Sequence, residues 1–428
     1  MRAQLAVLRN RRFALLTASR TISVLGNGFG TVALAFAILA LPGGTPARLS
    51  VVQAALALPQ LLVLVGGVIA DRVPRAWLMV CAELVAGLGY AGLAAMVLTG
   101  WSPLGGLVAL AVLGGLGYAL FQPAYTGMVP EVVAAADLPA ANALQRFGMN
   151  VGRILGFALA GGTVAVFGAG WALAADAASY LVSAVLIAFA AGAARRAPAT
   201  VGLATAPAGA RSAADAGAAE GGTVRRARVR PLADLREGWR EFAGRQWLWV
   251  IVAQFSVLMA CINAFLGVLG PLAARQDGGP TAWSAILVAQ TIGTFAGLVV
   301  AVRIRPRRPM LVATLATLAL ALPLLALGLG APLWATVAAA VVCGVGIDVF
   351  GVLWTTTLQR EVPAEAISRV SSWDIFGSLA MAPVGAAVAG PLAVTIGVRP
   401  TLVASAVLMV LVTAAALAAP EVRRLPAR

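Results

Sequence analysis

The side chains in this sequence that could do chemistry stand one at a time inside long apolar runs. Four are carboxylates (Glu83, Asp176, Asp348 and Asp374), and one is a guanidinium, Arg153. A carboxylate that alternates between an apolar site and the neighbourhood of an arginine can take up and release a proton. The sequence has no histidine, and it shows neither a nucleophile–base pair nor metal-ligand spacing. The pattern indicates proton and ligand binding and argues against an enzyme, a metal site or a cofactor.

Arg153 lies far inside its apolar run. About ten helical residues precede it, which at about 1.5 Å each places it roughly 15 Å from the start of the helix. An arginine at the centre of a bilayer costs at least about 2.5–3.5 kcal/mol. We therefore expect Arg153 to line a cavity, where it would suit an anionic or catecholate-bearing substrate, or to form a buried ion pair with an acid.

Asp348 is the deepest of the four carboxylates, so we expect it, before the other three, to be the group that couples transport to protons. Each carboxylate could instead cap a helix or form a structural pair. Five uncharged polar residues are expected to face the same cavity: Asn27, Gln60, Gln122, Asn263 and Gln290. Such side chains either contact a ligand or hold helices together, at about 0.6 kcal/mol each.

The composition indicates that lipid is the solvent of this chain. Its 428 residues are 61% hydrophobic and 11% charged, with a mean hydropathy of +0.93. A soluble domain is about a quarter charged. The net charge of +15 could indicate nucleic-acid binding, but the arginines alternate with apolar runs, so no nucleic-acid partner is expected. Without lysine the sequence has no phosphate-binding Gly-Lys-Ser/Thr motif, which argues against an ATP-driven pump on this chain.

A bilayer core needs about 20 apolar residues per helix. On this scale the sequence predicts an all-α membrane protein with twelve spans. Their predicted ranges are 14–40, 50–70, 77–98, 104–126, 143–167, 171–192, 247–270, 282–302, 310–329, 333–357, 372–395 and 400–419.

The arginines predict the orientation of the spans. With the N-terminus in the cytoplasm, 25 of the 31 basic residues lie in cytoplasmic segments, and the outer loops hold Arg48, Arg275 and Arg399. This asymmetry is the positive-inside pattern. We therefore expect a multi-pass protein of the cell inner (cytoplasmic) membrane, with both termini cytoplasmic and with the lipid bilayer as its surroundings.

The chain divides into two similar halves. Residues 1–192 and 246–428 each contain six predicted spans, and 193–245 form a cytoplasmic linker that ends in an amphipathic surface helix. Val129-Pro130-Glu131 after the fourth span is echoed by Glu361-Val362-Pro363 after the tenth. A parallel repeat of this kind places a small-molecule site between two bundles near mid-membrane.

A short charged turn joins the second and third spans. It reads Gly67-x-x-x-Asp71-Arg72-x-x-Arg75, and it either only sets the topology or acts as a conformational gate. The turn resembles the loop 2/3 signature of the major facilitator superfamily, from which Pro74 and Ala76 depart. The resemblance implies the major facilitator fold, and it implies that Asp71 contacts the start of the eleventh span, near Ser371 and Ser372.

Within that superfamily the chain most resembles drug and siderophore exporters, including enterobactin exporters and macrolide pumps. The residues that carry this resemblance are Leu8-Arg9-Asn10-Arg11-Arg12-Phe13, Phe121-Gln122-Pro123-Ala124, Ala141-Asn142-Ala143-Leu144, Asp176-Ala177-Ala178-Ser179, Leu235-Arg236-Glu237-Gly238 and an antiporter-like Gly152-x-x-x-Gly156. It implies a monomeric secondary active exporter that works by alternating access and proton antiport. An uptake permease of the same fold and a non-transporting membrane sensor are the alternatives.

Overall fold

The computed structural model describes the chain except for residues 1–5, 64–65, 67–68, 70–71, 197–238 and 427–428. The described residues form helices and no strands. In the described part of the N-terminal half the main helices are α2 (Arg11–Ala40), α3 (Pro46–Ala57), α5 (Arg75–Thr99), α6 (Leu104–Val132), α7 (Leu138–Phe167) and α8 (Ala169–Arg196).

The described part of the C-terminal half contains more helix pieces because three of its spans are divided and a short helix follows the last one. Its elements are α11 (Gln246–Ala264), α12 (Gly270–Gln276), α13 (Gly279–Arg303), α14 (Pro309–Ala316), α15 (Leu322–Gly328), α16 (Leu333–Glu361), α17 (Ala364–Leu379), α18 (Ala382–Thr395), α19 (Val398–Ala418) and α20 (Pro420–Arg424). A π-helical turn, Phe265–Leu269, joins α11 to α12, and a 3-10 turn, Thr317–Ala321, joins α14 to α15.

Among the described residues, eleven helices are long and apolar enough to cross a membrane. They coincide with eleven of the twelve predicted spans. The remaining span, predicted over 50–70, begins as α3 and continues as the 3-10 turn Leu58–Leu62, and part of its second half lies outside the described residues.

Local signals in the sequence set the helix ends. The side chain of Asn10 accepts hydrogen bonds from the backbone N–H groups of Arg12 and Phe13, which caps the start of α2. Gly100, at φ +73°, ends α5 in the left-handed conformation that glycine adopts without strain.

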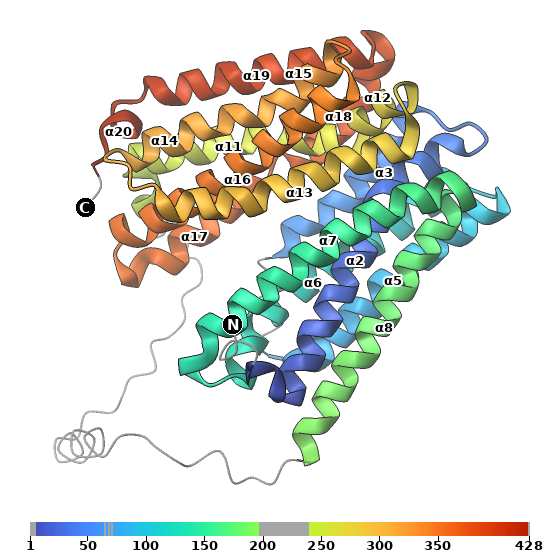
Figure 1. The fold of residues 1–428 in the computed structure, drawn as a ribbon, viewed down its shortest axis with the longest axis horizontal. Coiled ribbons are helices and arrows are strands. Elements are labelled where there is room, and N and C mark those ends of the chain that lie inside the picture. Colours follow the sequence, from blue (N-terminus) through green and yellow to red (C-terminus); the bar gives the residue numbers. More distant parts are fainter. Residues whose placement is uncertain (1–5, 64–65, 67–68, 70–71, 197–238, 427–428) are drawn as a thin grey trace.

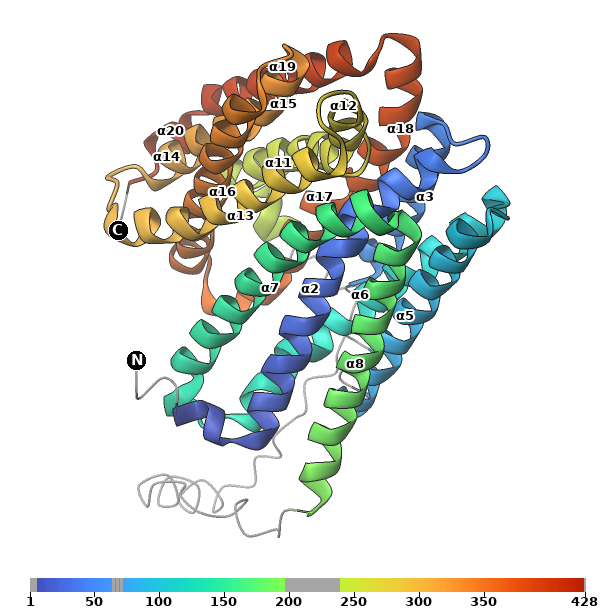
Figure 2. The same cartoon turned by 45° about the vertical axis from the view of Figure 1, so that its right-hand side comes forward.

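The two halves touch most closely at one end of the molecule, and their helices diverge toward the other (Figures 1 and 2). Further along, Phe147 of α7 and Phe295 of α13 still meet edge-on, at 6.3 Å between ring centroids. At the first end, here called the joined end, α3 packs against α18 and α7 packs against α13. The opposite end, here called the terminal end, carries both termini and the ends of the chain that flank residues 197–238 (Figure 1).

Direct polar contacts hold the joined end together. The backbone N–H of Gly390 on α18 donates to the buried hydroxyl of Ser50 on α3 over 2.6 Å. The amide of Gln53 donates to the backbone oxygen of Gly267 over 3.1 Å. The guanidinium of Arg275 donates to the backbone oxygen of Leu39 over 3.3 Å. Each of these bonds joins one half to the other.

Most of the predicted linker, including most of its surface helix, lies outside the described residues. The part of the surface helix that is described is helical and lies on the C-terminal half. Its Trp239 ring stacks on Phe242 and meets Trp373 of α17 edge-on, at 4.9 Å between ring centroids. The division at 193–245 remains a prediction.

Candidate functional site

A buried polar cluster lies inside the N-terminal half, between α2, α5, α6 and α8. Glu83 of α5 is 2% exposed, and its carboxylate accepts a 2.8 Å hydrogen bond from the Ser183 hydroxyl and a 3.5 Å bond from Ser23. Asn27 of α2 accepts a 2.5 Å bond from the Tyr180 hydroxyl. The structure therefore brings two of the predicted site residues, Glu83 and Asn27, into one cluster.

Arg20 also belongs to this cluster, although it was not predicted as a site residue. Its side chain is 6% exposed and donates a 3.0 Å hydrogen bond to Gln122. The guanidinium also lies 5.0 Å from the ring centre of Phe121 and 5.2 Å from that of Tyr125. A guanidinium that is desolvated against aromatic faces gains cation–π energy. The sequence shows that an arginine lies in the first span. It does not show the partners of that arginine, because they lie about a hundred residues away on α6.

We expect Arg20→Lys to destabilise the protein by about 1–2 kcal/mol, because an ammonium does not reproduce the planar stacking and fork of donors. Thermal unfolding in detergent measures this loss. Arg11→Lys is the matched control, because Arg11 is exposed on the same helix. Equal unfolding temperatures for the two variants would contradict the role given to Arg20.

Asp176 is the most enclosed carboxylate of the cluster. It is fully buried on α8, and its oxygens face Gly26 and Gly30 of α2, where an added Cβ would collide with them. Neither carboxylate oxygen makes a well-formed hydrogen bond among the described residues, although the Ser179 hydroxyl and the Gly30 backbone N–H lie close enough to influence its charge. The neighbouring Ser179 hydroxyl donates instead to the backbone oxygen of Asp176. A buried carboxylate without well-formed hydrogen bonds is costly, which marks this site for a role other than stability.

Arg153 of α7 faces the other half of the molecule. It is partly buried and lies within electrostatic range of Asp348 on α16, as does Arg146. Arg20 of the same half also acts on the charge of Arg153, and no direct ion pair joins Arg153 to Asp348 among the described residues. Both roles, cavity lining and ion pair, therefore remain predictions.

Asp374 of α17 is held by two donors in the C-terminal half. The indole N–H of Trp354 donates to one of its oxygens over 3.1 Å, and the Ser378 hydroxyl donates to the other over 3.4 Å. Asp374 and Asp348 line the same pocket.

A cavity of about 120 Å³ lies between the halves near the joined end. Gln60, Asn263 and Gln53 line it, together with Thr31 and Tyr90. The amide of Asn263 donates to the backbone oxygen of Met259 on its own helix. Gln290 lies elsewhere, on α13, and its amide contacts the thiol of Cys343 over 3.6 Å. Of the five predicted polar residues, Gln60 and Asn263 therefore share this cavity, and Asn27, Gln122 and Gln290 lie elsewhere.

The predicted gate is only partly described, because Gly67 and Asp71 lie outside the described residues. Arg72 is exposed. Arg75, at the start of α5, donates to the backbone oxygen of Gly127 over 2.7 Å and pairs with Glu131 over 2.8 Å. These bonds join α5 to the end of α6, so Arg75 links two helices of one half.

The antiporter-like glycines pack helices together. An added Cβ on Gly152 would lie 2.6 Å from the backbone oxygen of Thr21, and one on Gly156 would press on the backbone of Leu25. Both glycines therefore let α7 approach α2 closely.

Solved structures with the same arrangement of helices cover nearly the whole chain. The nucleoside transporter NupG aligns over 95% of this chain and 98% of its own, with a TM-score of 0.68 and 13% identity. The chain has the major facilitator fold. A POT family transporter in complex with a thioalcohol conjugated peptide gives a TM-score of 0.71 at 12% identity and covers 96% of each chain.

Sequence comparison adds information about the N-terminal half. Residues 2–213 match the family described as transmembrane secretion effector. No curated protein sequence matches the chain significantly. The major facilitator fold predicted from the sequence is confirmed, and the exporter subtype stays a prediction.

Proposed function

We propose that the protein is a secondary active transporter that exports a drug-like or siderophore-like small molecule by alternating access and proton antiport. The observation that carries this proposal is the arrangement of the halves, which touch at the joined end and diverge at the terminal end. Alternating access needs two bundles that can close either end around a central site.

The proposed direction rests on the arginine asymmetry and on the family match. If the positive-inside rule holds, the terminal end faces the cytoplasm, and the observed conformation would load substrate from there. The match of residues 2–213 to a secretion family also favours export. We propose the cell inner membrane as the location, cytoplasmic termini, a monomer, and the proton gradient as the energy source without a further cofactor.

Proton antiport requires a carboxylate that is reached from both sides in turn. The candidates are Glu83, Asp176, Asp348 and Asp374, all of which lie in membrane-spanning helices. Full pH-driven transport by Asp348→Asn would remove Asp348 from this set.

Transport in everted membrane vesicles tests the proposal. A fluorescent drug or a labelled siderophore is expected to accumulate inside vesicles with an acid interior and to leave when an ionophore collapses the pH gradient. Vesicles without the protein are the control. Accumulation with the opposite gradient would indicate an uptake permease, and inertness toward every compound, in vesicles shown to contain the folded protein, would favour a membrane sensor.

A further inference from the structure

The C-terminal half contains a pocket of about 420 Å³ of its own. Residues of α11, α16 and α17 line it, and most of the lining side chains are apolar or aromatic. Small-molecule sites in proteins typically measure about 300–1,000 Å³ and combine apolar walls with a few polar groups. The size and the lining both suit an organic ligand.

Stacked aromatic rings form one wall of this pocket. Phe255 and Phe350 stack at 4.9 Å between ring centroids with 9° between their planes, and Phe350 and Trp354 follow at 6.1 Å and 11°. All three residues line the pocket. Rings that stack face to face turn their faces toward one another, so this wall offers a ligand mainly an apolar surface.

Two carboxylates complete the pocket. Both oxygens of Asp374 accept hydrogen bonds, from Trp354 and Ser378, and these donors stabilise the carboxylate when it is ionised. Asp348 is partly buried on α16, and the positive charges of Arg146 and Arg153 in the other half act on its carboxylate. Asp374 is therefore the carboxylate whose charge is less offset by nearby arginines.

We propose that this pocket binds a lipophilic organic cation between the aromatic wall and Asp374, with Asp348 at its edge. This inference rests on the proposed transport function and names its substrate class. An anion would meet two carboxylates here. Ca²⁺ and Mg²⁺ prefer a shell of six or more oxygen ligands, which this mostly aromatic lining does not offer.

Two probes of the same shape and opposite charge test the proposal. Tetraphenylphosphonium and tetraphenylborate are each bound separately to the purified full chain in detergent, and binding to empty micelles is subtracted. We expect the phosphonium to bind at least about tenfold more tightly than the borate. Asp374→Asn is expected to weaken phosphonium binding about tenfold and to leave borate binding unchanged.

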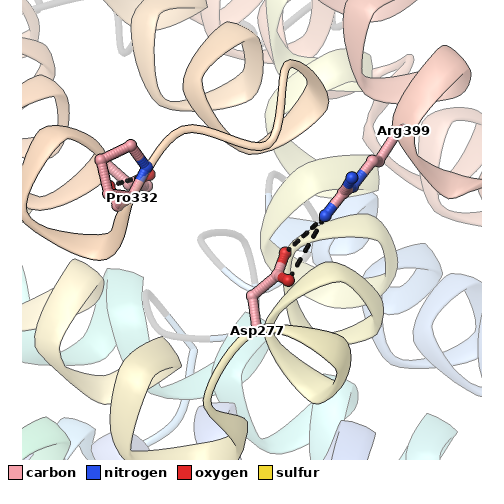
Figure 3. A network of polar contacts seen from close by, with 4 residues as sticks. Asp277, Pro332 and Arg399 are labelled. Atoms are coloured by element: carbon pink, nitrogen blue, oxygen red, sulfur yellow. Dashed lines mark hydrogen bonds and ion pairs between the residues drawn. The ribbon is translucent and has the colours of Figure 1, made fainter.

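Asp277→Asn is the matched control. Asp277 is a carboxylate of the same half, but it lies at the end of α12 and pairs with Arg399 at 3.3 Å, outside the pocket (Figure 3). This variant is expected to bind the phosphonium as the unmodified chain does. If Asp374→Asn does not yield folded protein, Asp348→Asn replaces it, with an expected loss of about threefold because nearby arginines already offset this charge.

The proposal is wrong if the borate binds as tightly as the phosphonium, or if the substitution at Asp374 leaves phosphonium binding unchanged or weakens both probes equally. Tighter borate binding would instead favour Arg153 as an anion site. Binding in detergent needs no gradient and no direction of transport. Failure of this inference is therefore separate from failure of the vesicle experiment.

Discussion

Gly161→Val is expected to prevent the two halves from packing together at the joined end, and so to abolish transport. Gly161 of α7 lies against α13 of the other half, where an added Cβ would overlap with the hydroxyl of Ser284 and lie 3.0 Å from the backbone oxygen of Pro280. Overpacking a close contact costs about 1–3 kcal/mol. A cost of this size shifts a two-state equilibrium by about 5- to 150-fold away from the conformation that is closed at the joined end.

The adjacent residue provides a matched control. An added Cβ on Gly162 would meet nothing within 4 Å, so Gly162→Val has the same helix propensity change without the collision. Spin labels at Pro42→Cys and Gln276→Cys, on exposed residues of the two halves near the joined end, report the separation by pulsed electron paramagnetic resonance.

The native cysteines, Cys81, Cys261 and Cys343, are replaced by serine for this measurement. A longer distance in Gly161→Val alone, together with loss of vesicle transport, is the expected result. Equal distances in both valine variants would show that the glycine contact does not control closure.

The positions of the spans could be predicted from the sequence, because lipid imposes long apolar runs that Gly, Pro and Arg interrupt. The ends of the helices were less predictable. The fourth and tenth spans were predicted to end at 126 and 357, whereas α6 runs to Val132 and α16 to Glu361. Apolarity marks where a helix lies in lipid, while backbone hydrogen bonding continues for another turn or more into polar surroundings.

The polar site could be predicted as a list of residues but not as an arrangement. Gln122 was expected at a cavity, and its oxygen is occupied by Arg20. Asn27 was expected there too, and it accepts the Tyr180 hydroxyl. These partners come from other helices, and helical periodicity carries no information about which faces of two separate spans meet. The same limit applies to Asp348 and Arg153, which belong to different halves.

A buried carboxylate costs folding stability, and we expect this cost to be largest at Asp176. Its side chain is fully buried, and its oxygens make no well-formed hydrogen bond among the described residues, although the Ser179 hydroxyl and the Gly30 backbone N–H lie close by. Leaving a buried polar group without a hydrogen bond costs about 1–3 kcal/mol by mutational measures, and a charged one costs more. Such a residue persists where the cost serves a function, for instance a site that binds and releases a proton.

Asp176→Asn is therefore expected to raise the thermal unfolding temperature while abolishing pH-driven transport. Asparagine has nearly the same shape, so it fits between Gly26 and Gly30, but it removes the charge and cannot carry a proton. Unfolding in detergent measures the stability gain, expected at about 1–3 kcal/mol. Vesicle uptake with and without a pH gradient separates coupling from movement of the substrate, and exchange of labelled for unlabelled substrate should persist.

Asp137→Asn is the control for this pair of measurements, because Asp137 is exposed in the same half. It should change neither the unfolding temperature nor the transport. A less stable Asp176→Asn protein that still responds fully to the pH gradient would show that Asp176 is a packing residue. Proton coupling would then have to be assigned to Glu83, whose carboxylate already has two hydroxyl partners, or to the carboxylates of the C-terminal half.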